Sequence, residues 1–314
     1  MCVGTAGLSG RVHAQWPIKT REHVDLWLTA FAELSQDTTA KVPVFRRDYL
    51  DQLGLAQNQQ SILTSLDSVH DGLQTHWDQA PRLADARALA LDAGTWDELH
   101  SAIDMYLNPP KDPKKRKAIV PDVEGHLVDY FSSTSDREWL KNLDYGLNGA
   151  KQQFYHGWWV AEQLRRRPVL AATDSLWRLT EPKLDRFLAA TNQPTGEIIL
   201  SLPVDGEGVT FKESGRTSVA APFPDSVADA AQVIYVFAHV AARALAGRND
   251  EPYMEAIGVR GGYMLLSKTA PELAKGYARY YLRTSPAGQD LAAAFPLPDA
   301  VREALEHKID LELK

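Results

Sequence analysis

The chain has one cysteine, Cys2, and no run of 18 or more uncharged apolar residues. A single cysteine excludes an internal disulfide and any Cys-x-x-Cys metal or redox motif. The lack of a long apolar run predicts that no helix spans a membrane. Three common signatures are also missing, namely the Gly-x-Ser-x-Gly nucleophile elbow, the Walker A loop and Gly-x-Gly-x-x-Gly. An activity would therefore have to rest on other residues.

Basic residues are fewer than acidic ones: the chain has 34 Lys and Arg, 41 Asp and Glu, and a formal net charge of −7. Nucleic-acid binding favours a basic surface, so we predict that the chain has no nucleic-acid partner. A content of 44% hydrophobic and 24% charged residues is typical of a globular protein. At 314 residues, the chain is long enough for one large domain or two smaller ones.

The first fourteen residues are small and irregular, and they end in Val12-His13-Ala14. A small-x-small ending is consistent with a signal-peptidase site, although no apolar signal core precedes it. We interpret residues 1–14 as an N-terminal segment that is either a shortened remnant of a signal or an irregular terminus without such a role. The expected location is secreted or periplasmic, with the cytoplasm as the alternative.

Residues 15–107 have the apolar spacing of a helical bundle. Between Arg21 and Gln36, the large apolar side chains recur at helical intervals. Thr95 and Glu98 form a capping-box pattern at the start of a later helix. The predicted helices of this bundle cover 21–36, 45–53, 57–77, 82–93 and 95–107.

A loop or linker rich in proline and lysine is predicted over residues 108–121. A long helix is expected from Ser135 to Arg167, with Pro168 as a break. The remaining predicted helices cover 252–268, 271–283, 288–295 and 298–311. A glycine pair, Gly261-Gly262, lies inside the first of these and indicates the close approach of another backbone.

A small antiparallel sheet is predicted just after residue 195. Strands are expected over 196–203, 209–211 and 217–222, because these segments are apolar and rich in β-branched residues. Asp205-Gly206 has the signature of a tight hairpin between the first two strands. Asp205 and Glu207 are therefore interpreted as exposed turn residues.

One long buried helix is predicted over residues 223–247, since almost every position after Ser226 is apolar. Asp225 or Ser226 is expected to cap its first turn, and Gly247 to end it in a left-handed conformation. The predicted fold class is α+β and predominantly α-helical, with a helical N-terminal bundle and a small antiparallel sheet that precedes a buried central helix.

His239 and Arg243 interrupt this apolar helix four residues apart, on the same face. A zinc peptidase helix reads His-Glu-x-x-His, in which two imidazoles bind the metal and the glutamate activates water. This chain has Val240 and Arg243 in place of the glutamate and the second histidine. A guanidinium beside His239 would repel a divalent cation. Because a lone buried arginine is costly, a carboxylate partner is expected, with these candidates nearest in sequence: Asp250, Glu251 and Glu255.

Residues 196–247, with a small sheet followed by a buried helix, resemble the zincin superfamily of metallopeptidases. The stretch from Gln15 to Leu28 is similar to the opening of uncharacterised secreted bacterial proteins. The zincin resemblance implies a zincin-like α+β domain over 122–314, whose edge strand holds a peptide by main-chain pairing. It also implies that His239 is the counterpart of the first zinc ligand, that Glu255 is a third ligand, and that a tyrosine of the set Tyr277, Tyr280 and Tyr281 faces the groove.

The function predicted from the sequence is non-catalytic binding of a peptide or an anionic small ligand by a zincin-like scaffold with a degenerate metal motif. The alternative is a hydrolase, related to metallopeptidases, with a non-standard active site in the same cleft. No cofactor is expected, and zinc, held by His239, belongs only to the alternative. Plain structural roles for the pair at 239 and 243 also remain open. The candidate pocket residues are His239, Arg243, Glu255 and Tyr281; no catalytic residue is assigned.

Overall fold

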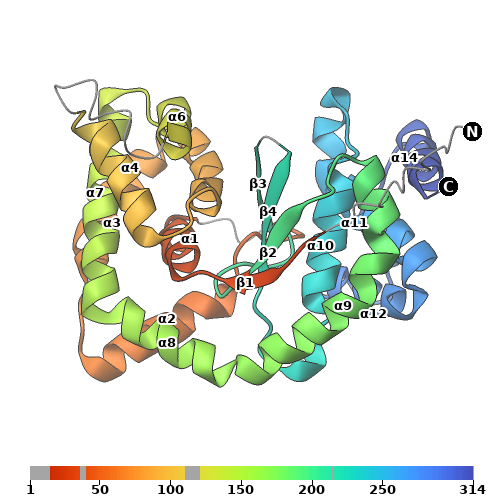
Figure 1. The fold of residues 1–314 in the computed structure, drawn as a ribbon, viewed down its shortest axis with the longest axis horizontal. Coiled ribbons are helices and arrows are strands. Elements are labelled where there is room, and N and C mark those ends of the chain that lie inside the picture. The colour runs from red at the N-terminus through yellow and green to blue at the C-terminus, as the bar shows by residue number, and fades with distance from the viewer. Residues whose placement is uncertain (1–14, 36–39, 110–120, 214, 314) are drawn as a thin grey trace, which may run out of the picture.

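The computed structural model describes residues 15–35, 40–109, 121–213 and 215–313 (Figure 1). The predicted segment 1–14 and most of the predicted loop 108–121 lie outside the described residues. The first half of the chain forms β1 (Ile18–Thr20), α1 (Glu22–Leu34), α2 (Arg47–Gln60), α3 (Ser65–Trp77), the 3-10 helix η1 (Pro81–Leu91), α4 (Trp96–Leu107), α6 (Pro121–Tyr130) and α7 (Thr134–Ala150).

The second half contains the strands β2 (Gly196–Ser201), β3 (Val209–Glu213) and β4 (Arg216–Pro222). Its helical elements are the π-helical turn η2 (Lys151–Tyr155), α8 (His156–Arg165), α9 (Arg167–Ala190), η3 (Val227–Asp229), α10 (Gln232–Arg243), η4 (Arg248–Tyr253), α11 (Met254–Thr269), α12 (Pro271–Tyr281), α13 (Leu291–Ala294) and α14 (Asp299–Glu312). The fold is α+β and predominantly helical, as predicted.

The sheet has the strand order β1-β2-β4-β3, with β1, β2 and β4 parallel and β3 antiparallel to β4. Ile198 of β2 pairs with Ile18 on one side and with Val219 on the other. The sheet is therefore mixed: the predicted antiparallel pairing holds between β3 and β4, whereas the other two pairings are parallel. β2 and β4 are almost fully buried, as is typical of parallel strands covered on both faces.

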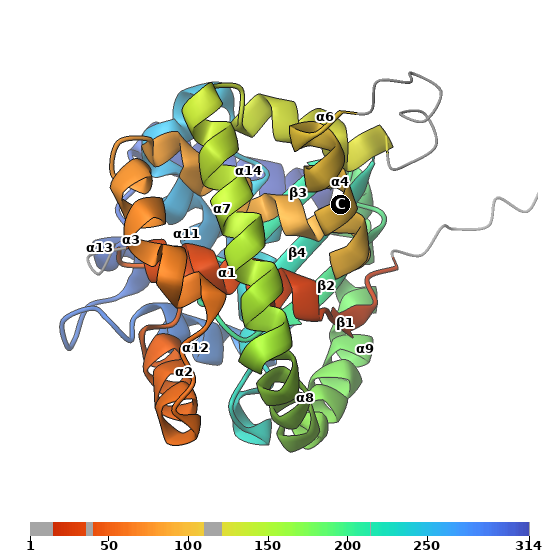
Figure 2. The same cartoon turned by 90° about the vertical axis from the view of Figure 1, so that its left-hand side faces the viewer.

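Helices lie on both sides of this sheet (Figure 1). On one side α3, α4, α6 and α7 form a helical layer, and on the other α9, α10, α11 and α12 form a second group. α7 packs against α3 and against α1, and it crosses the face of the molecule shown in Figure 2. Because α7 packs on α3 and β1 pairs with β2, elements of the predicted bundle 15–107 contact elements of the predicted domain 122–314.

The tight hairpin predicted at Asp205-Gly206 does not form, because β4 lies between β2 and β3. Residues 202–208 instead cross to the far edge of the sheet and pair with the segment that precedes α2. The amide of Asp205 donates to the carbonyl of Val44 at 2.7 Å, and that of Glu207 donates to Pro43 at 3.1 Å. The hairpin of this sheet joins β3 to β4, where Gly215 has a φ of 84° that suits glycine.

Apart from the central helix, the predicted helices are largely confirmed, with three main differences. The expected helix 57–77 is broken after α2, where Ser61 adopts a φ of 55° and Thr64 starts α3 with a capping box. Residues 81–91 form a 3-10 helix rather than an α-helix, and the backbone continues through Arg166 into α9 with only a short irregularity there. Among the described elements, the sequence patterns did not predict β1, α6, α9 and η4.

The central helix is buried as predicted but shorter, since α10 begins only at Gln232. A 3-10 turn precedes it, and Asp225 turns away to bind arginine side chains. Gly247 has a φ of −86°, so the left-handed end predicted there was wrong. Among the described residues, no helix is both long enough and apolar enough to cross a bilayer.

Asp25 joins α1 to the carboxyl end of β2 and to α8. Its side chain is fully buried and accepts hydrogen bonds from the Leu202 amide at 3.1 Å and from the Trp159 indole at 2.8 Å. Burial raises the pKa of Asp25 to about 7, although the hydrogen bonds from Trp159 and Leu202 oppose this shift. The folded protein therefore keeps a proton on Asp25 at pH values where the unfolded chain has lost it.

This raised pKa predicts that folding becomes less favourable as the pH rises from about 4 to about 7. Between about pH 5.5 and 7.5, the loss from this group amounts to about 2 kcal/mol, at about 1.4 kcal/mol per pKa unit. Asp25→Asn removes the titration, so its stability relative to the wild type should improve by that amount over the same interval. Urea denaturation of both proteins at both pH values measures the difference, and a difference that does not vary with pH would contradict the prediction.

Candidate functional site

His239 and Arg243 lie one turn apart on α10, and both contact the carboxylate of Glu207. The Nε2 atom of His239 is 3.1 Å from Glu207 Oε2. The Arg243 guanidinium forms an ion pair with Glu207 Oε1. Glu207 comes from the crossing segment 202–208, so one side chain of that segment joins both polar residues of the central helix.

The carboxylate expected beside Arg243 is thus present, but it is not one of the three expected from proximity in sequence: Asp250, Glu251 and Glu255. Nor are Asp205 and Glu207 exposed turn residues, because their side chains are only 18% and 11% exposed. Asp205 forms an ion pair with Arg283 and accepts a hydrogen bond from the Tyr280 hydroxyl at 3.0 Å. Both carboxylates turn inward because the segment that carries them crosses the molecule instead of reversing at a hairpin.

His239 is sealed inside the protein, with 0% of its side chain exposed. Burial lowers its pKa to about 4, and the charge of Glu255 opposes this only in part, so the imidazole is neutral at pH 7. A neutral ring that donates from Nε2 to Glu207 leaves Nδ1 as a bare acceptor. Among the described residues, Nδ1 has no hydrogen-bond partner.

The environment of His239 leaves no room beside the ring. The Tyr281 ring stacks on it with centroids 5.3 Å apart, and a Cβ at Gly258 of α11 would lie 2.5 Å from His239 Cε1. A Cβ at Gly262 would lie 3.0 Å from the His239 backbone nitrogen, so glycine allows the close approach of α10 and α11, as predicted for the Gly261-Gly262 pair. His239 therefore belongs to the interior rather than to an open groove.

The three tyrosines of α12 are occupied by contacts within the protein. Tyr281 donates its hydroxyl hydrogen to the Gly206 carbonyl at 2.9 Å, and Tyr277 donates to the Gly258 carbonyl at 3.2 Å. Tyr280 donates to Asp205. Burial raises the pKa of all three hydroxyls, which keeps them neutral. Glu255, in the first turn of α11, influences the pKa of His239 and of Arg243 through its charge.

Arg243 extends from this interior to a cavity of about 500 Å³ between η1, α6, β3 and α10. We call it the Arg87–Arg243 cavity. Its wall combines apolar residues with the following charged or polar side chains: Asp85, Arg87, His126, Tyr130, Gln193, Thr210, Lys212, Thr217 and Arg243. Of the four candidate pocket residues from the sequence, only Arg243 lines it.

The two arginines of the cavity come from distant parts of the chain, η1 and α10, and they repel each other. Burial lowers the pKa of Arg243, the charge of Arg87 lowers it further, and Glu255 opposes both effects. Burial also lowers the pKa of Arg87, with only the nearby Asp85 acting against it. Within the described part of the chain, the Arg87 guanidinium makes no hydrogen bond or ion pair. The wall therefore holds a cation whose donors are available.

Thr217 of β4 adds a polar group to the same wall. Its residue is 2% exposed, and its hydroxyl has no hydrogen-bond partner among the described residues. A buried polar group without a partner is costly, at about 1–3 kcal/mol. A hydroxyl in this state is suited to a ligand that enters the cavity.

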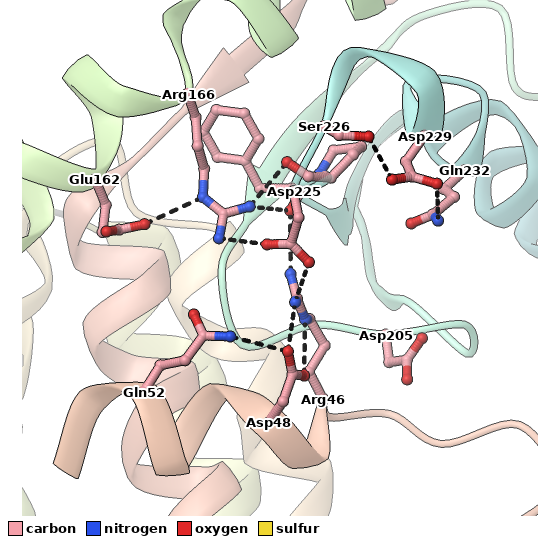
Figure 3. Close-up of polar contacts among 12 residues, drawn as sticks. Arg46, Asp48, Gln52, Glu162, Arg166, Asp205, Asp225, Ser226, Asp229 and Gln232 are labelled. Carbon is pink, nitrogen blue, oxygen red and sulfur yellow. Dashed lines mark hydrogen bonds and ion pairs between the residues drawn. The ribbon is translucent and has the colours of Figure 1, made fainter. Parts of the chain in front are cut away.

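A separate network of arginines and carboxylates surrounds Asp225, which lies in the loop between β4 and α10 (Figure 3). Asp225 receives Arg166 at 2.6 Å on one oxygen and Arg46 on the other. Arg166 also pairs with Glu162 at 3.2 Å, and Arg46 pairs with Asp48 at 2.9 Å. Figure 3 shows these side chains converging from the start of α2, the end of α8 and the loop after β4.

This network is structural in character because its charges compensate each other. Burial alone would raise the pKa of Asp225, but hydrogen bonds from Arg46 and the charges of Arg46 and Arg166 lower it below its usual value. Arg166, only 3% exposed, also donates to the carbonyls of Phe223 and Pro224 at 2.9 and 2.8 Å. The network therefore fixes the loop from which α10 starts, and with it the position of His239 and Arg243.

Within the described residues, one group of side chains is close enough to share a metal ion, and it does not include His239. The ligand atoms of Asp92, His126 and Glu213 all lie within 4.8 Å of one another. The sequence patterns did not indicate this group, because its members are separated by more than thirty residues at each step. No local spacing could have found it.

Comparisons of the chain with protein-family models, with curated proteins and with solved structures found no match.

Proposed function

We propose that this protein binds a small anionic ligand, without cleaving it, in the Arg87–Arg243 cavity. The observation that carries the proposal is the pair of guanidiniums on one wall, of which Arg87 has no fixed partner in the described part of the chain. Guanidinium groups recognise carboxylates and phosphates through paired hydrogen bonds. An anion between the two arginines would relieve their mutual repulsion.

The charge balance of the cavity supports an anion rather than a cation as ligand. Arg87, Lys212 and Arg243 contribute three positive charges to the wall, while Asp85 contributes one negative charge. Glu207 forms an ion pair with Arg243 but does not line the cavity. This local excess of positive charge occurs in a chain whose formal net charge is −7.

The size of the cavity supports a small ligand. Sites for small molecules usually have volumes of about 300–1,000 Å³, and this cavity has about 500 Å³. The unpartnered hydroxyl of Thr217 and the ammonium of Lys212 would add hydrogen bonds to the bound anion. Apolar wall residues such as Val209 and Met254 would contact its uncharged part.

Binding without catalysis is proposed because of the residues that α10 carries. Val240 also lines the cavity and offers no base where a zinc peptidase has glutamate. His239 is sealed beneath the wall and is engaged by Glu207. The zincin-like ancestry remains part of this proposal, with the cavity as the descendant of the peptidase groove. A hydrolase in the same cleft remains the alternative, and turnover of casein or model esters would favour it.

An extended peptide is a second candidate ligand, favoured by the position of β3 at the edge of the sheet. Its outer edge offers unpaired main-chain groups for strand addition. However, η1 packs beside β3, and His126 of α6 contacts Phe211 with ring centroids 5.1 Å apart. These neighbours restrict a long strand, so a short acidic peptide or a small anion fits better.

The test is calorimetric titration of the protein with inorganic phosphate and with succinate at constant ionic strength. Arg87→Gln should weaken binding by about 10- to 100-fold, because a hydrogen bond to a charged group is worth about 1.5–3 kcal/mol. Its folding stability should stay unchanged, since Arg87 makes no ion pair in the described part of the chain. Thr217→Val should weaken binding by a smaller factor.

Arg178→Gln is the matched control, because Arg178 is 75% exposed on α9 and forms an ion pair with Asp174 of the same helix. It removes the same charge without touching the cavity, so its affinity should equal that of the wild type. If neither anion binds the wild-type protein, or if Arg87→Gln binds as tightly as Arg178→Gln does, the proposal is wrong.

A further inference from the structure

We propose that Asp92, His126 and Glu213 form a binding site for a divalent transition-metal ion such as Zn²⁺ at the edge of the Arg87–Arg243 cavity. The three side chains come from the end of η1, from α6 and from the last residue of β3. Their ligand atoms lie within 4.8 Å of one another. This proposal does not depend on anion binding, since neither Asp92 nor Glu213 lines the cavity wall.

These ligand atoms suit a cation of intermediate softness such as Zn²⁺. Two carboxylates and one imidazole are ligands that zinc accepts in catalytic and exchangeable sites, where water completes the coordination. Two ionised carboxylates held together repel each other, and a divalent ion would neutralise them. The permanently charged guanidinium that disqualifies the motif at 239–243 is not among these ligands.

Two contacts fix the His126 ring in a position from which it can bind a metal ion. Its Nε2 atom is 3.2 Å from Glu213 Oε1, and its ring packs edge-on against Phe211 with centroids 5.1 Å apart. Phe211 and Glu213 are two residues apart on β3, so both side chains point to the same face of the strand, toward α6. Tetrahedral zinc needs ligands at about 2.0–2.2 Å from the ion, and an inward rotation of half-exposed side chains would close the remaining distance.

Access to the site is provided by the cavity. The side chains of His126 and Glu213 are 28% and 35% exposed, so an ion has to pass only these side chains to reach the buried atoms His126 Nε2 and Asp92 Oδ2. His126 lines the cavity itself, whose space would hold the water molecules that complete the coordination shell. The site therefore has three protein ligands and an open side, rather than the closed shell of a structural zinc site.

The test is calorimetric titration of tag-free, chelator-treated protein with Zn²⁺, followed by metal analysis after dialysis. We expect one zinc ion per chain and a higher melting temperature with zinc. His126→Ala and Glu213→Gln should each weaken binding by at least about 100-fold, more than the loss of an outer-shell partner costs. Circular dichroism of the variants without metal checks that they are folded.

The matched control is His100→Ala. His100 pairs with Asp144 at 2.7 Å on a half-exposed surface, and it has no third metal-binding side chain in the described residues. Zinc affinity should be unchanged in this variant. The proposal is overturned if the wild type binds no stoichiometric zinc, in which case the group is a solvated ion pair. It is also overturned if zinc binding survives in His126→Ala and Glu213→Gln.

Discussion

Replacement of Arg166 by methionine is expected to lower the free energy of unfolding by about 3–5 kcal/mol, the range for removal of one partner from a buried ion pair. Arg166 is 3% exposed and lies between two carboxylates, Asp225 and Glu162 (Figure 3). It also satisfies the carbonyls of Phe223 and Pro224. Methionine fills a similar volume but leaves these acceptors without a donor. Urea denaturation at neutral pH measures the loss.

Arg165→Met is the control for this experiment. Arg165 is the preceding residue, is 53% exposed and pairs with the same Glu162. An exposed pair of this kind contributes less than about 1 kcal/mol. Arg166→Lys should be intermediate, because it keeps the charge but loses the planar fork that reaches several acceptors at once. Equal stabilities of the variants at 165 and 166 would show that the network does not hold the loop before α10.

Glu207→Gln is expected to have two opposite effects, a loss of about 3 kcal/mol in folding stability and tighter binding of phosphate. The variant keeps an acceptor for His239 but removes the charge that Arg243 faces. The stability loss falls at the low end of the range for broken buried pairs, because the Arg243 side chain is 34% exposed and reaches the cavity. Its freed charge should raise phosphate affinity by about five- to tenfold, or about 1 kcal/mol.

Glu251→Gln is the matched control, since Glu251 is an exposed carboxylate that sequence proximity made a candidate partner of Arg243. It should change stability by less than about 0.5 kcal/mol and leave phosphate affinity unaltered. A double-mutant cycle that combines Glu207→Gln with Arg243→Gln separates the interaction energy of the two side chains from the stability that each single substitution costs. If Glu207→Gln is as stable as the wild type, the ion pair is not a structural contact; if it is less stable but binds phosphate no more tightly, Arg243 does not face the ligand.

Local patterns predicted most of the helices and strands because these elements depend on nearby residues. The apolar spacing after Arg21 gave α1, the apolar run after Gly196 gave β2, and Thr95 caps α4 as expected. β1 was missed because three residues carry too little periodicity. Asp205-Gly206 has the composition of a hairpin turn, but whether β2 and β3 pair depends on the competing strand β4.

The candidate site was predictable only in part. His239 and Arg243 were found together because both lie on one helix, where a spacing of four residues fixes their neighbourhood. Their partner Glu207 was misplaced because it reaches them across the sheet. Arg87 gave no signal in the sequence, since its significance depends on η1 lying beside β3 and opposite α10.

The sequence by itself determined a predominantly helical α+β chain, a buried central helix and the adjacent placement of an imidazole and a guanidinium on it. These properties follow from side-chain periodicity and burial within single segments. Only the tertiary structure decided that His239 is sealed, that Arg243 meets Arg87 in a cavity, and that Asp92, His126 and Glu213 converge. Such contacts depend on how distant segments pack, and the free energy of that packing is shared by many residues rather than encoded in any local pattern.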